Sequence, residues 1–327
     1  MGANLMLAVL LAAQTAAPPQ GASTVEAVVL TTTTGELSGS LIVPTGTSRP
    51  PVVLILAGSG PTDRDGNSTL IPGQNNAYRL LAESLAASGI ASLRYDKRGI
   101  GASRAAGREV DLRFDTYVDD AVAWLARLRA DARFGRVIVA GHSEGSLIGM
   151  LATAKAPADA FVSMAGVAQR ASDALRAQLR PQIGGVAPLW DASSAVLTSL
   201  EAGTLVEPLP QALQGVPALA ALYRPSVQPY LISWFKYVPS TTLATLTVPT
   251  LILQGTTDIQ VPVDEARALA AAKPNAELHI VDGMNHVLKA APADRTQNIA
   301  TYSNPALPIV PEAAQAIVDF VRRTAGR

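Results

Sequence analysis

Ser143 is the residue whose sequence context points most directly to chemistry. It is the central serine of a G-x-S-x-G motif at 141–145, which follows an apolar stretch at 137–140 and precedes a helical pattern at 147–156. A strand, a sharp turn with this motif and a helix together form a nucleophile elbow. Glycine permits the strained backbone that such a turn requires. We therefore predict that Ser143 is a catalytic nucleophile, with a structural turn as the alternative.

A serine hydroxyl needs a base that removes its proton, and a histidine can also protonate the leaving group later. Of the three histidines, His286 lies in a loop after the last strand pattern, whereas His279 lies within that pattern. The tight turn is expected to aim the side chain of His142 away from the site. We predict His286 as the base and Asp258, which also follows an apolar run, as the acid that orients its ring.

Two other aspartates close to these residues have ordinary structural explanations. Asp264 lies past Pro262 at the predicted start of a helix, where a carboxylate caps the backbone and favours the helix dipole. Asp282 precedes Gly283, as expected of a residue that shapes a turn. Asp258 therefore remains the predicted third member of the triad.

Strand and helix patterns alternate along most of the chain. This alternation predicts an α/β fold with a mainly parallel sheet and helices on both faces. A Thr34-Gly35 turn predicts an antiparallel hairpin before that region. The predicted strands are 25–33, 37–43, 51–56, 91–95, 136–140, 160–164, 250–254 and 277–281, and the predicted helices lie near 77–88, 116–130, 147–156, 264–272 and 311–323.

Residues 169–240 differ from the rest because they contain no strand pattern and are rich in aromatic residues and prolines. We predict a helical cap here, inserted into a core of residues 21–168 and 241–327, over the carboxyl ends of the strands where open α/β sheets bind ligands. Tyr230 and Trp234 are spaced to share one helix face, with Phe235 adjoining, and are predicted to line a substrate pocket. The alternative is that they form the cap's own core.

Composition excludes several classes of function. The chain of 327 residues has 26 basic and 26 acidic residues without a long run of either sign, so nucleic acid and anionic membranes are not expected partners. It has no cysteine, which excludes disulfides, thiolate catalysis and cysteine-ligated metals. No metal or organic cofactor is predicted, and no oligomeric state follows from the sequence.

Residues 1–20 resemble a signal peptide with a weakly basic start. An apolar run at 5–13 is too short to span a bilayer as a helix, and small residues at 15–17 precede two prolines. We therefore expect export to a periplasm or out of the cell, without integral membrane association. A packed or disordered extension on a cytoplasmic protein is the alternative.

The order Ser143, Asp258, His286, with each residue after a strand, resembles the α/β-hydrolase fold superfamily. The resemblance runs from about residue 22 to the end, cap included. More narrowly, the chain is similar to the bacterial serine esterases grouped with the serine aminopeptidase-like hydrolases. The segments that carry this similarity are Ala57-Gly58-Ser59-Gly60-Pro61, Asp96-Lys97-Arg98-Gly99-Ile100-Gly101-Ala102-Ser103, and Gly255-Thr256-Thr257-Asp258 with Val261-Pro262.

The resemblance implies an oxyanion hole formed by the backbone amides of Ser59 and Glu144. Ala57 stands where the family commonly has histidine, which does not affect a backbone donor. The charged loop 63–67 is expected to be braced by ion pairs with Arg98 or Lys97, and Arg98 is assigned a structural role.

The predicted function is that of a carboxylesterase that acts on small-molecule esters through an acyl-enzyme on Ser143. A serine peptidase or amidase of the same fold is the first alternative, but an aminopeptidase needs free acids to bind a substrate amine. Late in the cap only Asp191, Glu201 and Glu207 could serve, and the sequence offers none of them an obvious partner. A non-catalytic ligand-binding scaffold is the second alternative.

Overall fold

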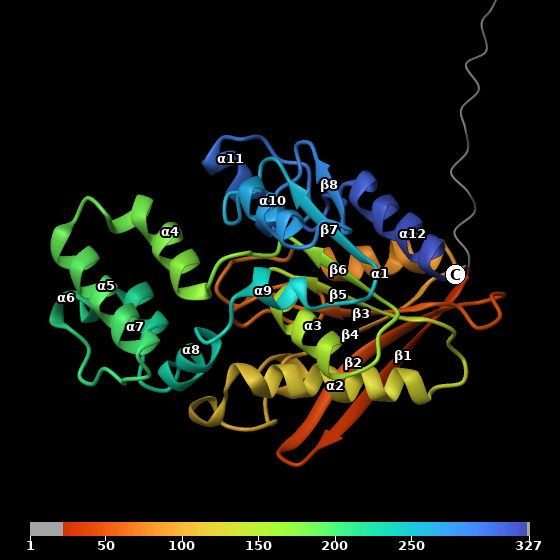
Figure 1. Cartoon of the computed structure of the whole chain (residues 1–327), viewed down its shortest axis with the longest axis horizontal. Helices are drawn as coiled ribbons and strands as arrows, with labels where there is room; N and C mark the ends of the chain where they lie inside the picture. The colour runs from red at the N-terminus through yellow and green to blue at the C-terminus, as the bar shows by residue number, and fades with distance from the viewer. Residues whose placement is uncertain (1–21, 326–327) are drawn as a thin grey trace, which may run out of the picture.

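A computed structural model describes residues 22–325 of the chain. Its centre is one eight-stranded sheet with the strand order β1-β2-β4-β3-β5-β6-β7-β8. Figure 1 shows this sheet with helices around it and a separate group of helices to one side. The strands are β1 (Ser23–Thr32), β2 (Gly35–Pro44), β3 (Val52–Leu56), β4 (Ala91–Tyr95), β5 (Val137–His142), β6 (Ala160–Met164), β7 (Thr250–Gly255) and β8 (Glu277–Val281).

The first two strands form an antiparallel hairpin at one edge of the sheet. Thr32 pairs with Gly35 next to the turn, and β2 continues antiparallel against β4. From β4 through β8 all neighbouring strands are parallel. The carboxyl ends of β3 to β8 therefore meet at the same edge, and the loops that follow them are brought together there.

Helices cover both faces of the parallel strands because these strands are apolar on both sides. Every residue of β3, β4, β5, β6 and β7 is buried. One face packs against α1 (Ala77–Ala87) and α12 (Pro311–Ala325). The other packs against α2 (Phe114–Ala130), α3 (Glu144–Lys155) and α10 (Val263–Ala272). The predicted fold class is confirmed.

Between β6 and β7 the chain forms a group of short helices, which we call the cap. Figure 1 shows α4 to α8 at the left, away from most of the sheet. Its members are α4 (Ala171–Ile183), α5 (Ala187–Glu201), α6 (Gln211–Gln214), α7 (Pro217–Leu222) and α8 (Gln228–Trp234), and α9 (Pro239–Ala244) leads back to β7. The cap has its own apolar cluster, formed by Ala171, Val196, Leu197, Leu200, Leu213, Leu219, Tyr223, Leu231 and Phe235.

The remaining short elements are 3-10 turns η1 (Gly101–Ser103), η2 (Glu109–Asp111) and η3 (Thr301–Ser303), and helix α11 (Arg295–Ala300). In residues 22–325 no helix combines the length and apolar character needed to cross a membrane. The predicted signal peptide at 1–20 lies outside the described residues.

Candidate active site

Ser143 lies at a strained turn between β5 and α3. Its φ of 54° and ψ of −121° are unfavourable for a residue with a side chain, at a cost of about 1–3 kcal/mol. A Cβ on Gly141 would lie 2.1 Å from the carbonyl oxygen of Gly145, and one on Gly145 would lie 2.5 Å from that of Leu56. Both glycines of the motif are therefore required by lack of space, and the turn presents the serine at the carboxyl edge of the sheet.

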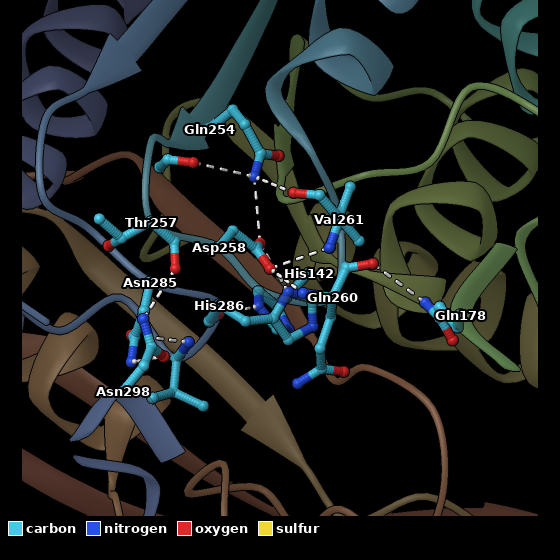
Figure 2. Close-up of polar contacts among 12 residues, drawn as sticks. His142, Gln178, Gln254, Thr257, Asp258, Gln260, Val261, Asn285, His286 and Asn298 are labelled. Atoms are coloured by element: carbon cyan, nitrogen blue, oxygen red, sulfur yellow. Dashed lines mark hydrogen bonds and ion pairs between the residues drawn. The ribbon is translucent and has the colours of Figure 1, made fainter. Parts of the chain in front are cut away.

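Asp258 and His286 face each other across the loops that follow β7 and β8. The Asp258 Oδ2 and His286 Nδ1 atoms are 2.8 Å apart, and both side chains are buried (Figure 2). The ring is therefore held at Nδ1, which leaves Nε2 as the nitrogen that can exchange a proton with a substrate or with Ser143. The structure thus brings together the predicted acid and the predicted base.

The carboxylate of Asp258 receives four hydrogen bonds. Its Oδ1 accepts from the backbone amides of Gln260 and Val261, at 2.8 and 2.9 Å, and its Oδ2 accepts from His286 and from Gln254 Nε2, at 2.8 and 3.0 Å. Burial opposes ionisation, but His286 and the backbone donors favour the charged form more strongly, so the pKa of Asp258 lies below its ordinary value. This carboxylate is therefore charged at neutral pH.

Gln254 is a site residue that sequence reasoning missed. It is fully buried at the end of an apolar strand, and its amide also donates to the carbonyl of Val261, at 2.8 Å (Figure 2). A polar residue in a buried strand must find partners, which is the signal that could have identified it. Gln254 ties β7 to the loop that carries Asp258.

The loop that carries His286 is fixed by Asn285. The side-chain oxygen of Asn285 accepts from the amide of Lys289 at 3.0 Å, and its nitrogen donates to Thr301 Oγ1 at 2.7 Å. Asn285 is 1% exposed, so these bonds are shielded from water. The backbone on either side of His286 therefore has little freedom to move.

His142 contacts the base, which corrects the expectation that its side chain points away from the site. Its Nε2 lies 2.7 Å from the backbone oxygen of His286, and the two rings are 4.7 Å apart (Figure 2). Since a carbonyl oxygen only accepts, Nε2 must carry the proton and Nδ1 must accept from the hydroxyl of Tyr78, 2.8 Å away. Burial, and next the neighbouring His286, lower the pKa of His142 to about 3. Sequence spacing gave no signal of this contact.

The two predicted oxyanion donors lie on either side of the nucleophile. Glu144 is the first residue of α3, so its amide has no acceptor within the helix. Ser59 follows β3, and a Cβ on the preceding Gly58 would lie 3.2 Å from Ser143 Cβ. In residues 22–325 no acceptor is found for the Ser59 amide. Both amides can therefore donate to an oxygen that develops charge next to Ser143.

Ion pairs brace the charged loop 63–67, but with partners other than the predicted ones. Arg64 pairs with Asp96 at 2.7 Å, and Asp65 pairs with Arg94 at 2.9 Å. Arg98 instead points to the other side of its loop and binds Asp120 of α2 at 2.6 Å. The prediction of Arg98 or Lys97 as the partner is therefore wrong, while the structural role of Arg98 agrees with its buried ion pair.

The three cap aromatics differ in their surroundings. Phe235 is 3% exposed and belongs to the cap's own apolar cluster, which favours the alternative of a cap core for this residue, and its pocket role stays a prediction. Trp234 stacks on Phe114 of α2, with ring centres 5.7 Å apart and planes 3° apart. Tyr230 packs against Phe114 and Tyr117, at 6.1 and 5.6 Å. Tyr230 and Trp234 thus lie between cap and core, and their pocket role stays a prediction.

A cavity of about 560 Å³ opens beside the loop that carries Asp258. Helix α4 contributes Ala174 and Gln178 to its wall, and the lining also includes Gln260, Ile299 and Tyr302. Such a cavity is large enough for a small organic substrate. In the same described part of the chain, no three His, Asp or Glu side chains are grouped so that they could hold a metal ion.

One cap acid considered for binding a substrate amine is already paired. Glu201 accepts from Arg176 at 2.7 and 2.8 Å, which corrects the expectation that it has no partner. Asp191 and Glu207 are exposed. The paired carboxylate is not available to a substrate amine.

Comparisons with known proteins identify a family and a relative with similar sequences. Residues 73–201 match the family described as serine aminopeptidase, S33. Esterase EstD of Thermotoga maritima is 25% identical over 265 residues, which cover 78% of this chain and 59% of that protein. The chain therefore spans about three fifths of the length of this curated relative.

Two solved esterase structures show the same fold. Est1E from Butyrivibrio proteoclasticus superimposes with a TM-score of 0.58 at 17% identity, covering 92% of this chain and 99% of that one. The Pyrococcus furiosus esterase Pf2001 has a TM-score of 0.58 at 18% identity, covering 92% and 91%.

Proposed function

We propose that this member of the α/β-hydrolase fold superfamily is a carboxylesterase that acts through an acyl-enzyme on Ser143. The observation that carries the proposal is the buried pair of Asp258 and His286, 2.8 Å apart, at the same sheet edge as the strained Ser143. A buried carboxylate that fixes a histidine ring by Nδ1 is the arrangement that activates a serine hydroxyl. The names of the similar proteins, which are esterases, support the choice of substrate class.

The proposed reaction has two halves. His286 Nε2 takes the proton of the Ser143 hydroxyl as its oxygen attacks the ester carbonyl, and Asp258 stabilises the imidazolium. The amides of Ser59 and Glu144 bind the oxyanion, and the proton passes from His286 to the departing alcohol. Water then attacks the acyl-enzyme, again with His286 as base, which releases the acid and restores Ser143.

The cap favours an ester over a peptide substrate. A peptidase that recognises a free amino terminus needs an unpaired acid near the nucleophile. Glu201 is engaged by Arg176, and the acids left over in the late cap are exposed. An ester needs only apolar walls and the oxyanion donors. A peptidase or amidase remains the second candidate because the matched family model bears that description.

We also propose that residues 1–20 are a signal peptide and that the enzyme works in a periplasm or outside the cell. The support is the apolar run at 5–13 followed by small residues and prolines. Sequencing the amino terminus of the protein recovered from cell fractions tests this proposal. An intact Met1 on a cytoplasmic protein would contradict it.

The test of the function compares p-nitrophenyl esters with p-nitroanilides and adds a fluorophosphonate probe. Wild type should hydrolyse the esters and be labelled on Ser143, and Ser143→Ala should lose both, with turnover falling on the order of 10⁴-fold or more. Ser146→Ala is the matched control, because in the described residues the Ser146 hydroxyl bonds to that of Ser163 in the interior. Faster cleavage of anilides would favour the amidase, and an unlabelled wild type would indicate a non-catalytic scaffold.

A further inference from the structure

The peptide groups on both sides of Gly58 are held by buried side chains. The Gly58 amide donates to the Tyr78 hydroxyl at 3.1 Å, and the Gly58 carbonyl accepts from Lys97 Nζ at 2.5 Å. Gly58 is also confined by its neighbours, because a Cβ there would lie 3.2 Å from both His142 Nδ1 and Ser143 Cβ. The backbone next to the nucleophile therefore has one well-defined orientation.

That orientation decides where the Ser59 amide points. The carbonyl of Gly58 and the N–H of Ser59 belong to one peptide group, and the cis peptide bond found in residues 22–325 is Glu207–Pro208. The Gly58–Ser59 bond is thus trans, with its C=O and N–H on opposite sides. An ammonium group that binds the carbonyl fixes the N–H in the opposite direction and, by polarising the peptide, makes it a better donor.

Lys97 is a buried charged residue at the centre of these contacts. It is 4% exposed, and burial of a lysine is costly unless its charge is compensated. Glu144 Oε1 lies 3.6 Å from Lys97 Nζ, and the ring of Tyr117 lies 5.2 Å from it. Burial lowers the pKa of Lys97, and Glu144 opposes this shift. The lysine therefore contacts both segments whose amides flank Ser143.

We propose that Lys97 is a positioning residue of the oxyanion hole, which holds the Gly58 carbonyl so that the Ser59 N–H faces the developing oxyanion. The proposal rests on the proposed function, since it concerns the same reaction. It goes further by giving a role to a side chain that does not touch the substrate. Loss of one oxyanion donor costs about 10²–10³-fold in kcat, so misdirecting one should cost on the order of tenfold to a hundredfold.

The test uses Lys97→Met, which keeps an unbranched side chain as far as Cε and removes the donor at Nζ. We expect kcat to fall on the order of tenfold to a hundredfold with KM near the wild-type value. Affinity for an alkyl boronic acid, which forms a tetrahedral adduct on Ser143, should fall in parallel with kcat. Lys97→Gln keeps an uncharged donor and should lose less of both. If Lys97→Met does not fold, parallel loss in Lys97→Gln carries the test.

Lys273→Met is the matched control for the loss of a buried lysine. Lys273 is also 4% exposed and also donates to a backbone carbonyl, that of Leu246, at 2.5 Å, and neither residue belongs to the site described above. It should lower thermal stability and leave kcat per folded molecule unchanged. In Lys97→Met the carboxylate of Glu144 loses its cation. The double variant Lys97→Met/Glu144→Gln removes that negative charge as well, and its kcat should stay as low as that of Lys97→Met.

Three results would overturn the proposal. The first is a kcat of the folded Lys97 variants within twofold of wild type, and the second is a lower kcat with unchanged affinity for the boronic acid. The third is recovery of kcat in the double variant, which would make charge balance the only role of Lys97. A wild type that hydrolyses esters through Ser143 while the Lys97 variants behave as wild type refutes the positioning role alone. A wild type without Ser143-dependent ester hydrolysis refutes the proposed function.

Discussion

The loops at the carboxyl edge of the sheet and the helices of the cap are stabilised by different kinds of contact. At the sheet edge, polar groups saturate one another, as in the four bonds to Asp258 and the side-chain bonds of Asn285. In the cap, apolar side chains from five helices form a small cluster, supplemented by buried bonds of Ser193 with Tyr223 and of Gln228 with the backbone.

From this difference we infer that the sheet edge determines the rate of the chemical step, whereas the cap determines substrate preference. Hydrogen bonds between buried groups permit one geometry, because a misplaced donor leaves an unsatisfied partner. Apolar clusters tolerate changes of shape at modest cost, provided that total volume is preserved. Substitutions at the sheet edge should therefore reduce turnover strongly, whereas substitutions in the cap should alter stability or substrate preference. The predictions below test that separation.

The largest effect is expected for Asp258→Asn. An amide at this position can present its oxygen to His286 only if the ring keeps its proton on Nδ1, and it provides no charge to stabilise the imidazolium. We expect kcat to fall on the order of 10⁴-fold with little change in KM. Ester hydrolysis under saturating substrate measures this loss.

Asp264→Asn is the matched control for that change. Asp264 lies six residues further along, but its side chain is 84% exposed and pairs with Arg267 on the surface. Its activity should equal that of wild type. A large loss at Asp264 with retained activity in Asp258→Asn would reverse the assignment of the acid.

The parts of the site set by local geometry were accessible from sequence. A serine between two glycines after an apolar strand predicts a turn at Ser143, because only glycine fits at 141 and 145. Asp258 and His286 could be found because each follows a strand whose carboxyl end must lie at the same edge as the others. The parallel pairing of β7 and β8 with the strands before them places the two loops at one edge, where Asp258 Oδ2 and His286 Nδ1 lie 2.8 Å apart.

Contacts that depend on which side chains meet across loops could not be predicted. Lys97 and His142 lie inside family-like motifs, yet their partners are Gly58, 39 residues away, and the backbone of His286, 144 residues away. Nor could helical spacing distinguish Phe235, which faces the cap cluster, from its neighbour Trp234. Adjacent residues of a helix point in different directions, and only the packing decides which direction is inside.

The pH dependence of unfolding that His142 causes tests how strongly its buried hydrogen bonds hold the sheet edge. In the folded protein the pKa of His142 is about 3, against an ordinary value of 6.5 in the unfolded chain. Between these two pH values the unfolded chain binds more protons than the folded protein, so the free energy of unfolding rises with pH. The stability that His142 contributes is present above pH 6.5 and is lost as the pH falls towards 3. The loss from this one residue should be on the order of a few kcal/mol.

His142→Gln removes the titrating group and should flatten the pH dependence of unfolding across that interval. Denaturant melts of wild type and variant at a series of pH values measure the slope. The contribution of Asp258 is present above its ordinary pKa of 3.8 and is lost below it, in both proteins. Parallel curves between pH 4 and 6.5 would show that His142 is protonated in the folded state, contrary to the bonds described for it.

The smallest effect is expected in the cap, at the face formed by Tyr230 and Trp234. These rings are 6.0 Å apart. Burial, and next the neighbouring carboxylate of Glu144, raise the pKa of Tyr230 well above its ordinary value. Tyr230 packs on Tyr117, whose ring lies 5.2 Å from Lys97 Nζ. Lys97 Nζ in turn lies 3.6 Å from Glu144 Oε1, on the residue that follows Ser143, so contacts connect this face to the nucleophile. An acyl chain on Ser143 could therefore extend along it.

Trp234→Ala should then reduce kcat/KM more for hexanoyl than for acetyl esters. Each methylene that loses contact with the ring contributes about 0.8 kcal/mol, or roughly a fourfold change in preference. Phe235→Ala is the paired variant, since it removes an adjacent aromatic ring from the cap cluster without touching that face. It should lower the melting temperature and keep the wild-type ratio of hexanoyl to acetyl hydrolysis. If both variants lose stability and neither changes the ratio, Trp234 serves only to attach the cap to Phe114, and the acyl chain must lie elsewhere, with the cavity beside Asp258 as the next place to probe.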